Sequence, residues 1–132
     1  MTNPKLGRDY LHRARGRRKA IESLFQEKLF ADVVRECQEA CELALKGIIR
    51  EAGHSVPMVH DVSEKLKEIQ KDLPKKLQAK LQEVCDISKQ LRRDRELSFY
   101  GSEDITPSDF YTVDDAKEAM KKLDLVLGLV KR

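Results

Sequence analysis

The sequence predicts an all-α protein, a five-helix up-and-down antiparallel bundle that forms one domain over residues 1–132. Three observations predict it. Apolar residues recur at three- and four-residue spacing along the chain. Only 5% of the residues are aromatic while 37% are charged, a balance that suits amphipathic helices better than a β-sandwich. Glycines and prolines are few and fall between the periodic segments, and residues 1–8 are expected to be flexible.

The first two helices are expected over residues 9–27 and 31–52. On the first, one face carries Leu11, Ala14, Ile21, Leu24 and Phe25, and Arg18 interrupts that stripe. The second has the clearest pattern, a wide stripe typical of the central helix of a bundle. Its members are Val33, Val34, Cys37, Ala40, Cys41, Ala44, Leu45, Ile48 and Ile49. Gly53 is well placed to terminate it.

Three further helices are expected over residues 64–73, 75–99 and 113–130. Asp61 or Ser63 suits the cap of the third, and Pro74 suits the first turn of the fourth. The apolar stripe of the fourth is Leu77, Leu81, Val84, Cys85, Ser88, Leu91 and then Arg95. Thr112 is the expected cap of the fifth, whose inward face is Ala116, Ala119, Met120, Leu123, Val126, Leu127 and Val130. No strand pattern competes.

Composition limits the function classes. No run of about 18 apolar residues suggests a membrane span, and the N-terminus lacks the apolar region of a secretory signal. The three cysteines lack CxxC spacing, so we expect a reducing, cytoplasmic location. The net charge is only +3, but seven Lys and Arg residues lie between Lys5 and Lys19 against Asp9 alone. That segment indicates either a phosphate-bearing partner or a solvated helix face.

Arg95 is the first candidate site residue, because it continues the apolar stripe of the fourth helix. Its guanidinium either reaches solvent near the helix end or pairs with an anion in a cleft, where it would hold phosphate in a bidentate manner. Arg92 is one turn upstream on the same face, and Tyr100 would add a stacking surface or a hydroxyl just past the helix.

Two other groups of polar residues are candidates. Gln38, Glu42 and Lys46 recur every four residues, which is typical of a surface ladder, or places Glu42 against the fourth helix to orient Arg95. His60 either belongs to a local turn capped by Asp61 or reaches a neighbouring cleft. Cys37 and Cys41 fit core packing better than a metal site, and no Walker A, HExxH, GxGxxG or GxSxG motif occurs. We therefore expect no metal and no cofactor.

Two stretches resemble the HEPN domain family (higher eukaryotes and prokaryotes nucleotide-binding). "CQEACELALKGIIREAGHSVPMVHDVSEKL" resembles the family's Q-x-A-x-E-x-x-L-K helix, followed by a small residue and a loop with P-x-x-H-D. Here Gln38, Ala40, Glu42, Leu45 and Lys46 match the helix, and Pro57, His60 and Asp61 match the loop. "DRELSFYGSEDITPSDFYTVDDAKEAM" resembles the C-terminal stretch of the family, so the resemblance runs from Phe30 to the C-terminus.

The resemblance implies a five-helix bundle, frequent homodimers and, in many prokaryotic members, a minimal nucleotidyltransferase partner in a toxin–antitoxin-like pair. Some members are metal-independent ribonucleases with an R-x(4–6)-H motif near the end of the fourth helix. Here Arg95 supplies the arginine, but Tyr100 stands where the histidine is expected, and no histidine follows His60. Tyrosine is a poor general base at neutral pH.

We therefore expect a nucleotide- or nucleic-acid-binding module rather than an enzyme. Its ligand would be a nucleotide or RNA, bound by Arg92, Arg95, Tyr100, Glu42 and Lys46. Two alternatives stay open. One is an endoribonuclease toxin in which Arg95, Tyr100 or His60 is catalytic, and the other is a helical protein-interaction module without a ligand of its own.

Overall fold

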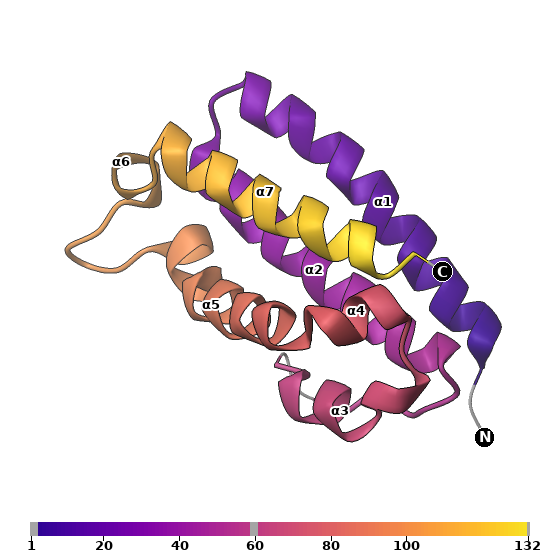
Figure 1. Ribbon diagram of the computed structural model, residues 1–132. Helices are drawn as coiled ribbons and strands as arrows, with labels where there is room; N and C mark the ends of the chain where they lie inside the picture. The colour runs from indigo at the N-terminus through magenta and orange to yellow at the C-terminus, as the bar shows by residue number, and fades with distance from the viewer. Residues whose placement is uncertain (1–2, 59–60, 132) are drawn as a thin grey trace.

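The computed structural model describes residues 3–58 and 61–131, apart from the side chains of residues 92–99. These ranges form an all-helical bundle without strands (Figure 1). The long helices are α1 (Pro4–Gln26), α2 (Phe30–Glu51), α5 (Leu81–Tyr100) and α7 (Val113–Leu129). The short ones are α3 (Ser63–Glu68), the 3-10 turn η1 (Gln70–Asp72), α4 (Lys75–Ala79) and α6 (Pro107–Phe110). The all-α bundle is as the sequence predicts.

Helix α2 is the centre of the bundle, as its wide apolar stripe predicts. α1 and α7 pack against it, and α5 packs against its opposite flank, with α3 and α4 beside α5 (Figure 1). All nine predicted stripe residues of α2 are buried, and so are the seven of the last helix. α1 and α5 are therefore separated by α2 and α7.

Several local signals act as expected. Gly53 ends α2 with a φ of +90°, a value that glycine adopts without strain. Thr112 caps α7 in a reciprocal capping box: its Oγ1 accepts from the Asp115 amide at 3.2 Å, and its own amide donates to Asp115 Oδ2 at 2.8 Å. The third helix differs, because its N-cap is Val62 rather than Asp61 or Ser63, although Asp61 Oδ1 accepts a hydrogen bond from the Ser63 amide at the start of α3. The last helix begins at Val113, as predicted.

Three predicted helices differ from the structure in their bounds. The third, expected over residues 64–73, is divided at Ile69 into α3 and η1. α1 begins at Pro4 rather than at residue 9, because Asn3 accepts a hydrogen bond from the Leu6 amide and Pro4 occupies the first turn. Residues 4–8 are therefore helical, and Gly7 is buried. The predicted fourth helix is divided at Lys80 into α4 and α5. Leu77 and Leu81 are both buried across this break, so the apolar spacing carries no sign of it.

The α1–α2 crossing is unusually close at two glycines. A Cβ atom on Gly7 would lie 2.6 Å from the Gly47 carbonyl oxygen and 2.6 Å from the Glu51 amide nitrogen. A Cβ on Gly47 would lie 3.0 Å from the Gly7 carbonyl oxygen. Only glycine allows the two backbones to approach this far, which gives a physical reason for the small residue after Lys46.

Candidate functional site

The polar ladder on α2 forms as the spacing predicts. Gln38 Nε2 donates to Glu42 Oε1 at 3.5 Å, and Lys46 Nζ lies 3.6 Å from Glu42 Oε2. The ladder is not an ordinary surface feature. Gln38 is only 3% exposed, and the Glu42 and Lys46 side chains are 14% and 21% exposed.

Gln38 and Glu42 are shielded from solvent because they face α5 across a small hollow. Its lining consists of Gln38, Cys41, Glu42, Ser88 and Leu91. Glu42 therefore faces α5, the helix that carries Arg95. The cavity volume is about 10 Å³, near the least that one water molecule needs, so a nucleotide cannot enter it. Any larger ligand would lie across its mouth.

Gln38 carries an unsatisfied atom in this hollow. Its Oε1 is buried without a hydrogen-bond partner. A buried polar oxygen without a partner costs about 1–3 kcal/mol, so native proteins seldom retain one without a reason. A donor arriving at the mouth of the hollow, such as a water or a ligand hydroxyl, would satisfy it.

Asp61 joins the loop after α2 to α5, which the sequence does not reveal. Its Oδ1 accepts from Ser63 Oγ at 2.5 Å and from Ser88 Oγ at 3.2 Å, in addition to the Ser63 amide. Burial raises the pKa of Asp61, but these hydrogen bonds and the nearby Lys89 charge outweigh it and leave the pKa below its ordinary value. Asp61 is thus an ionised cross-link between the loop and α5. Ser88 is its partner on α5 and also lines the hollow.

The remaining predicted site residues are not gathered there. Tyr100 ends α5 and is 77% exposed. It lies twelve residues beyond Ser88, or about 18 Å along the axis of α5. Gly101 follows with a φ of +74° and starts a tight turn in which the Ser102 amide donates to the Ile105 carbonyl. His60 and the side chains of Arg92 and Arg95 lie outside the described residues, so their roles stay predictions.

A second hollow between α5 and α7 adjoins the first across Leu91, and the sequence analysis does not identify it. Its volume is about 160 Å³. Its lining consists of Val34, Gln90, Leu91, Tyr111, Asp115, Glu118, Ala119 and Lys122. Lys122 Nζ lies 2.6 Å from Gln90 Oε1 and 3.2 Å from Glu118 Oε1, so it ties α7 to α5. The four-residue spacing of Glu118 and Lys122 was the available signal.

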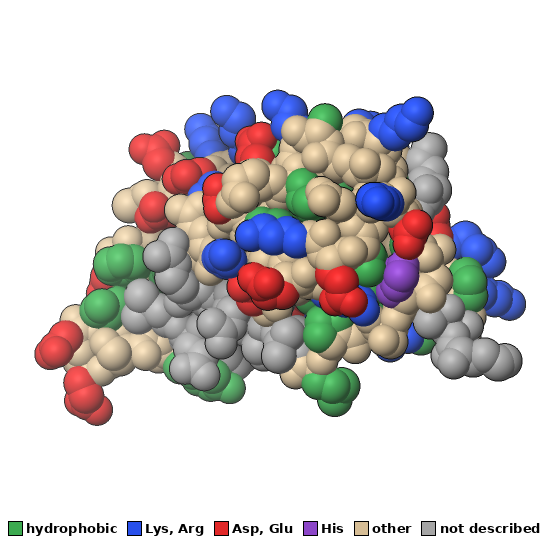
Figure 2. Space-filling view, turned by 60° about the horizontal axis from the view of Figure 1, so that its bottom comes forward, with side chains coloured by type: hydrophobic (Ala, Val, Ile, Leu, Met, Phe, Trp, Pro, Cys, Tyr) green, Lys and Arg blue, Asp and Glu red, His purple; other side chains and the backbone are tan. Residues whose placement is uncertain are grey.

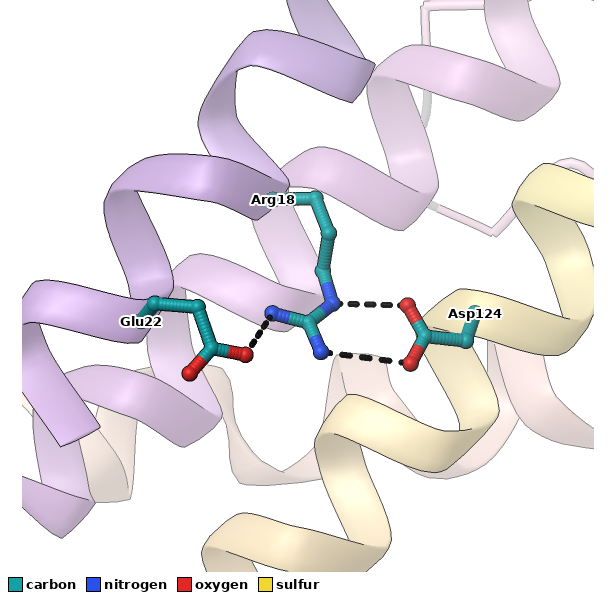
Figure 3. A network of polar contacts seen from close by, with 3 residues as sticks. All are labelled: Arg18, Glu22 and Asp124. Atoms are coloured by element: carbon teal, nitrogen blue, oxygen red, sulfur yellow. Dashed lines mark hydrogen bonds and ion pairs between the residues drawn. The ribbon is translucent and has the colours of Figure 1, made fainter.

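The basic residues of α1 belong to a different part of the molecule. Arg18, which interrupts the α1 stripe, donates through Nε and Nη2 to the two carboxylate oxygens of Asp124 on α7, at 2.6 and 3.2 Å, and through Nη1 to Glu22 at 3.0 Å (Figure 3). The hydrogen bond to Asp124 raises the pKa of Arg18 more than burial lowers it. Arg17 lies 3.9 Å from Glu36 on α2. These ion pairs join α1 to α2 and to α7.

The cysteines are core residues, as expected. Burial raises the pKa of the Cys37 and Cys41 thiols to about 12 each, and it also raises the pKa of Cys85. Such thiols are poor nucleophiles and poor metal ligands at neutral pH. Within the part of the chain that the structure describes, no three His, Cys, Asp or Glu residues are grouped to hold a metal ion. No described helix is both long and apolar enough to cross a membrane.

Comparison with known proteins agrees with the fold. The model of the HEPN domain matches residues 8–132, nearly the whole chain. No curated protein and no solved structure matches the sequence. The chain therefore belongs to the HEPN domain family, whose members are nucleotide- and RNA-related modules.

Proposed function

We propose that this protein binds a nucleotide or single-stranded RNA at the mouth of the α2–α5 hollow. The observation that supports the proposal most is the polar pair of buried Gln38 and partly buried Glu42, which faces α5 in a domain of the HEPN family. Glu42 would orient Arg95, Arg95 and Arg92 would hold phosphate, and Gln38 Oε1 would accept from a ligand donor. Lys46 would hold Glu42 in place through their ion pair, and Tyr100 would stack on a base farther along α5.

The charge distribution on this side of the molecule favours individual contacts over a diffuse field. Figure 2, turned so that the side of the bundle with α3, α4 and α5 comes forward, shows Lys and Arg side chains interspersed with Asp and Glu. A mixed surface attracts nucleic acid weakly from a distance. Affinity would therefore depend on a few arginines, and removing one of them should be visible.

The proposal favours binding over catalysis. The position that would supply a general base holds Tyr100, which lies about 18 Å along α5 from Ser88. The described residues around the hollow carry a carboxylate, an amide, a hydroxyl, a thiol and an alkyl group, and none is a histidine. These groups suit recognition of a ligand better than activation of a ribose hydroxyl.

The decisive experiment measures binding and cleavage together. End-labelled single-stranded RNA is incubated with EDTA and the wild type, Arg95→Ala or the control Arg13→Ala. The control removes the same side chain from α1, where the described contacts of Arg13 are within its own helix: Asp9 at 3.8 Å and the Tyr10 ring. Salt-sensitive binding without cleavage, lost in Arg95→Ala and kept in Arg13→Ala, is the expected result.

Other outcomes of that experiment point elsewhere. Cleavage by the wild type but not by Arg95→Ala would make the protein a ribonuclease and overturn the binding proposal. Absence of both activities, with RNA and with nucleoside triphosphates, would favour a protein-interaction module. Equal loss in both variants would show that only overall charge matters.

We further propose that the protein is a cytoplasmic homodimer that pairs with a minimal nucleotidyltransferase in a toxin–antitoxin-like system. Exposed apolar side chains near the α5–α7 end support the dimer: Tyr100, Phe110 and Val113 are 77%, 50% and 39% exposed. Phe110→Asp should give a monomer in sedimentation analysis. Met58→Asp is the control, because Met58 is fully exposed in the connector before α3. A wild-type monomer at high concentration would refute the dimer, and co-purification with a nucleotidyltransferase tests the partner.

A further inference from the structure

A hollow at the opposite end of the bundle carries positive charge that neither the family match nor the α2–α5 site explains. Its volume is about 320 Å³. Its lining consists of Arg8, Leu11, Arg15, Glu51, Val130 and Lys131. These residues come from the first half of α1, the end of α2 and the end of α7. Figure 1 shows the C-terminal end of the chain lying beside that part of α1.

Helix geometry explains why the two arginines meet here. Arg8 and Arg15 are seven residues apart, with Leu11 between them, so all three lie on one face of α1. Leu11 is buried against the core and sets the direction of that face. Lys131 arrives from the last residues after α7 and supplies a third cation.

Arg15 carries an unsatisfied hydrogen-bond donor at this hollow. Its Nε is buried and has no hydrogen-bond partner, and Arg15 forms no ion pair with another described residue. Arg13, Arg17 and Arg18 on the same helix all have a carboxylate within 4 Å. Arg15 thus differs from its neighbours, and a guanidinium with free donors suits a phosphate oxygen.

Compensation of helix dipoles is the competing explanation, because α2 and α7 both end near this hollow. Each C-terminus carries roughly half a negative charge, and Glu51 adds a full one. Three cations exceed that total by about one charge, so dipole compensation leaves a surplus. The surplus, the open volume and the unsatisfied Arg15 together indicate an anion site.

We propose that this hollow binds a phosphate group, carried by the tail of a nucleoside triphosphate or by an RNA backbone. Arg15 donates from the floor, and Arg8 and Lys131 close on the phosphate from the rim. The site lies across α2 from α5 and does not depend on Arg95. This site can therefore be tested independently of the binding proposed at the α2–α5 hollow.

The test compares two double variants of the full chain with equal net charge. Arg8→Gln/Lys131→Gln removes the two rim cations, which are exposed, so the fold is kept. Arg13→Gln/Lys19→Gln removes two exposed cations of α1 outside the hollow. Inorganic tripolyphosphate is titrated into each protein at low salt, and binding is followed by calorimetry and by the rise in melting temperature.

The rim variant should bind tripolyphosphate about tenfold more weakly or worse, because two charge-assisted contacts are lost. The control variant should stay within about twofold of the wild type, because those charges are distant and screened. An equal loss in both would overturn the site in favour of diffuse attraction. A wild type that does not bind tripolyphosphate would overturn it outright.

Two additional arms identify the source of the phosphate. A nucleoside triphosphate that binds as tightly as tripolyphosphate would assign the site to a nucleotide tail. A short RNA lacking terminal phosphates, bound by Arg95→Ala but not by the rim variant, would assign it to the RNA backbone. Loss of RNA binding in Arg95→Ala with tripolyphosphate binding intact would separate this site from the α2–α5 hollow.

Discussion

On one flank of α2, helix α1 packs through two glycines and an apolar stripe. The Arg18–Asp124 ion pair joins α1 to α7 on this flank. On the other flank, α5 packs over polar atoms: Ser88 bonded to Asp61, and the Gln38–Glu42 pair. At Gly7 and Gly47 the first arrangement leaves backbone against backbone, so no ligand can enter between α1 and α2 at that crossing. The second leaves a buried acceptor unsatisfied. This difference suggests that the glycine crossing of α1 and α2 determines stability, whereas the α2–α5 contact contributes to recognition.

The largest expected effect is on the α1 flank. Gly7→Ala places a Cβ atom 2.6 Å from two backbone atoms of α2, so the helices must separate. We expect a loss of about 2 kcal/mol in the free energy of unfolding, measured by urea denaturation. Gly16→Ala on the same helix is the control, because nothing lies within 4 Å of its Cβ. It should gain up to about 1 kcal/mol from helix propensity. A stable Gly7→Ala protein would refute the close crossing.

Asp61→Asn should be next, at about 1–2 kcal/mol, because three donors lose an ionised acceptor. The pKa of Asp61 is lower in the folded protein than in the unfolded chain. Its contribution is therefore complete above about pH 4 and is lost as the pH falls through the folded-state pKa. Unfolding of wild type and variant between pH 2 and pH 7 measures this. A difference that grows at low pH would contradict the cross-link, and Asp86→Asn, exposed on α5, is the control.

Asp124→Asn should cost about 1 kcal/mol, because the bidentate contact with Arg18 is lost but the carboxylate is half exposed. The cost should shrink as salt is added. Thermal unfolding at two salt concentrations would measure it. Glu22→Gln, which removes a single contact with Arg18 within α1, should cost less.

The smallest effect on stability is expected at Gln38, although its effect on binding should be large. Gln38→Met removes a buried oxygen that has no partner and keeps the volume similar, so unfolding should change by less than about 1 kcal/mol. RNA binding should fall. A large loss of stability with binding unchanged would make Gln38 a structural residue and would weaken the comparison between the two flanks.

Hydrophobic periodicity predicted the fold because the apolar residues that recur at helical spacing are the ones that pack into the core. The stripes of α2 and α7 are buried residue for residue, and Thr112 and Gly53 act where the sequence places them. The break at Lys80 was missed because Leu77 and Leu81 keep helical spacing across it. The role of Gly7 was not predicted, because a glycine inside a helix adds nothing to the apolar pattern. Its role depends on how closely α2 approaches it, which the sequence does not show.

The site was predicted less completely. The four-residue spacing identified Gln38, Glu42 and Lys46, but it did not show that they are nearly buried. Asp61 was interpreted as a cap of α3, but the N-cap is Val62. Asp61 instead bonds to Ser88, 27 positions away, and a bond of that range has no local signal. Arg18 showed the opposite case: an arginine on an apolar stripe does indicate a distant partner, here Asp124.

The three buried thiols provide natural reporters of motion. The charges of Arg18 and Asp124 act on the Cys37 thiol, which places Cys37 toward the α1 and α7 flank. Cys85 Sγ lies 3.8 Å from the Ser63 carbonyl at the start of α3. None can react with an alkylating reagent until its surroundings open. The relative rates at which Cys85 and Cys37 become labelled would show which flank opens more readily. The native sequence thus allows the breathing of the bundle to be followed without adding a probe.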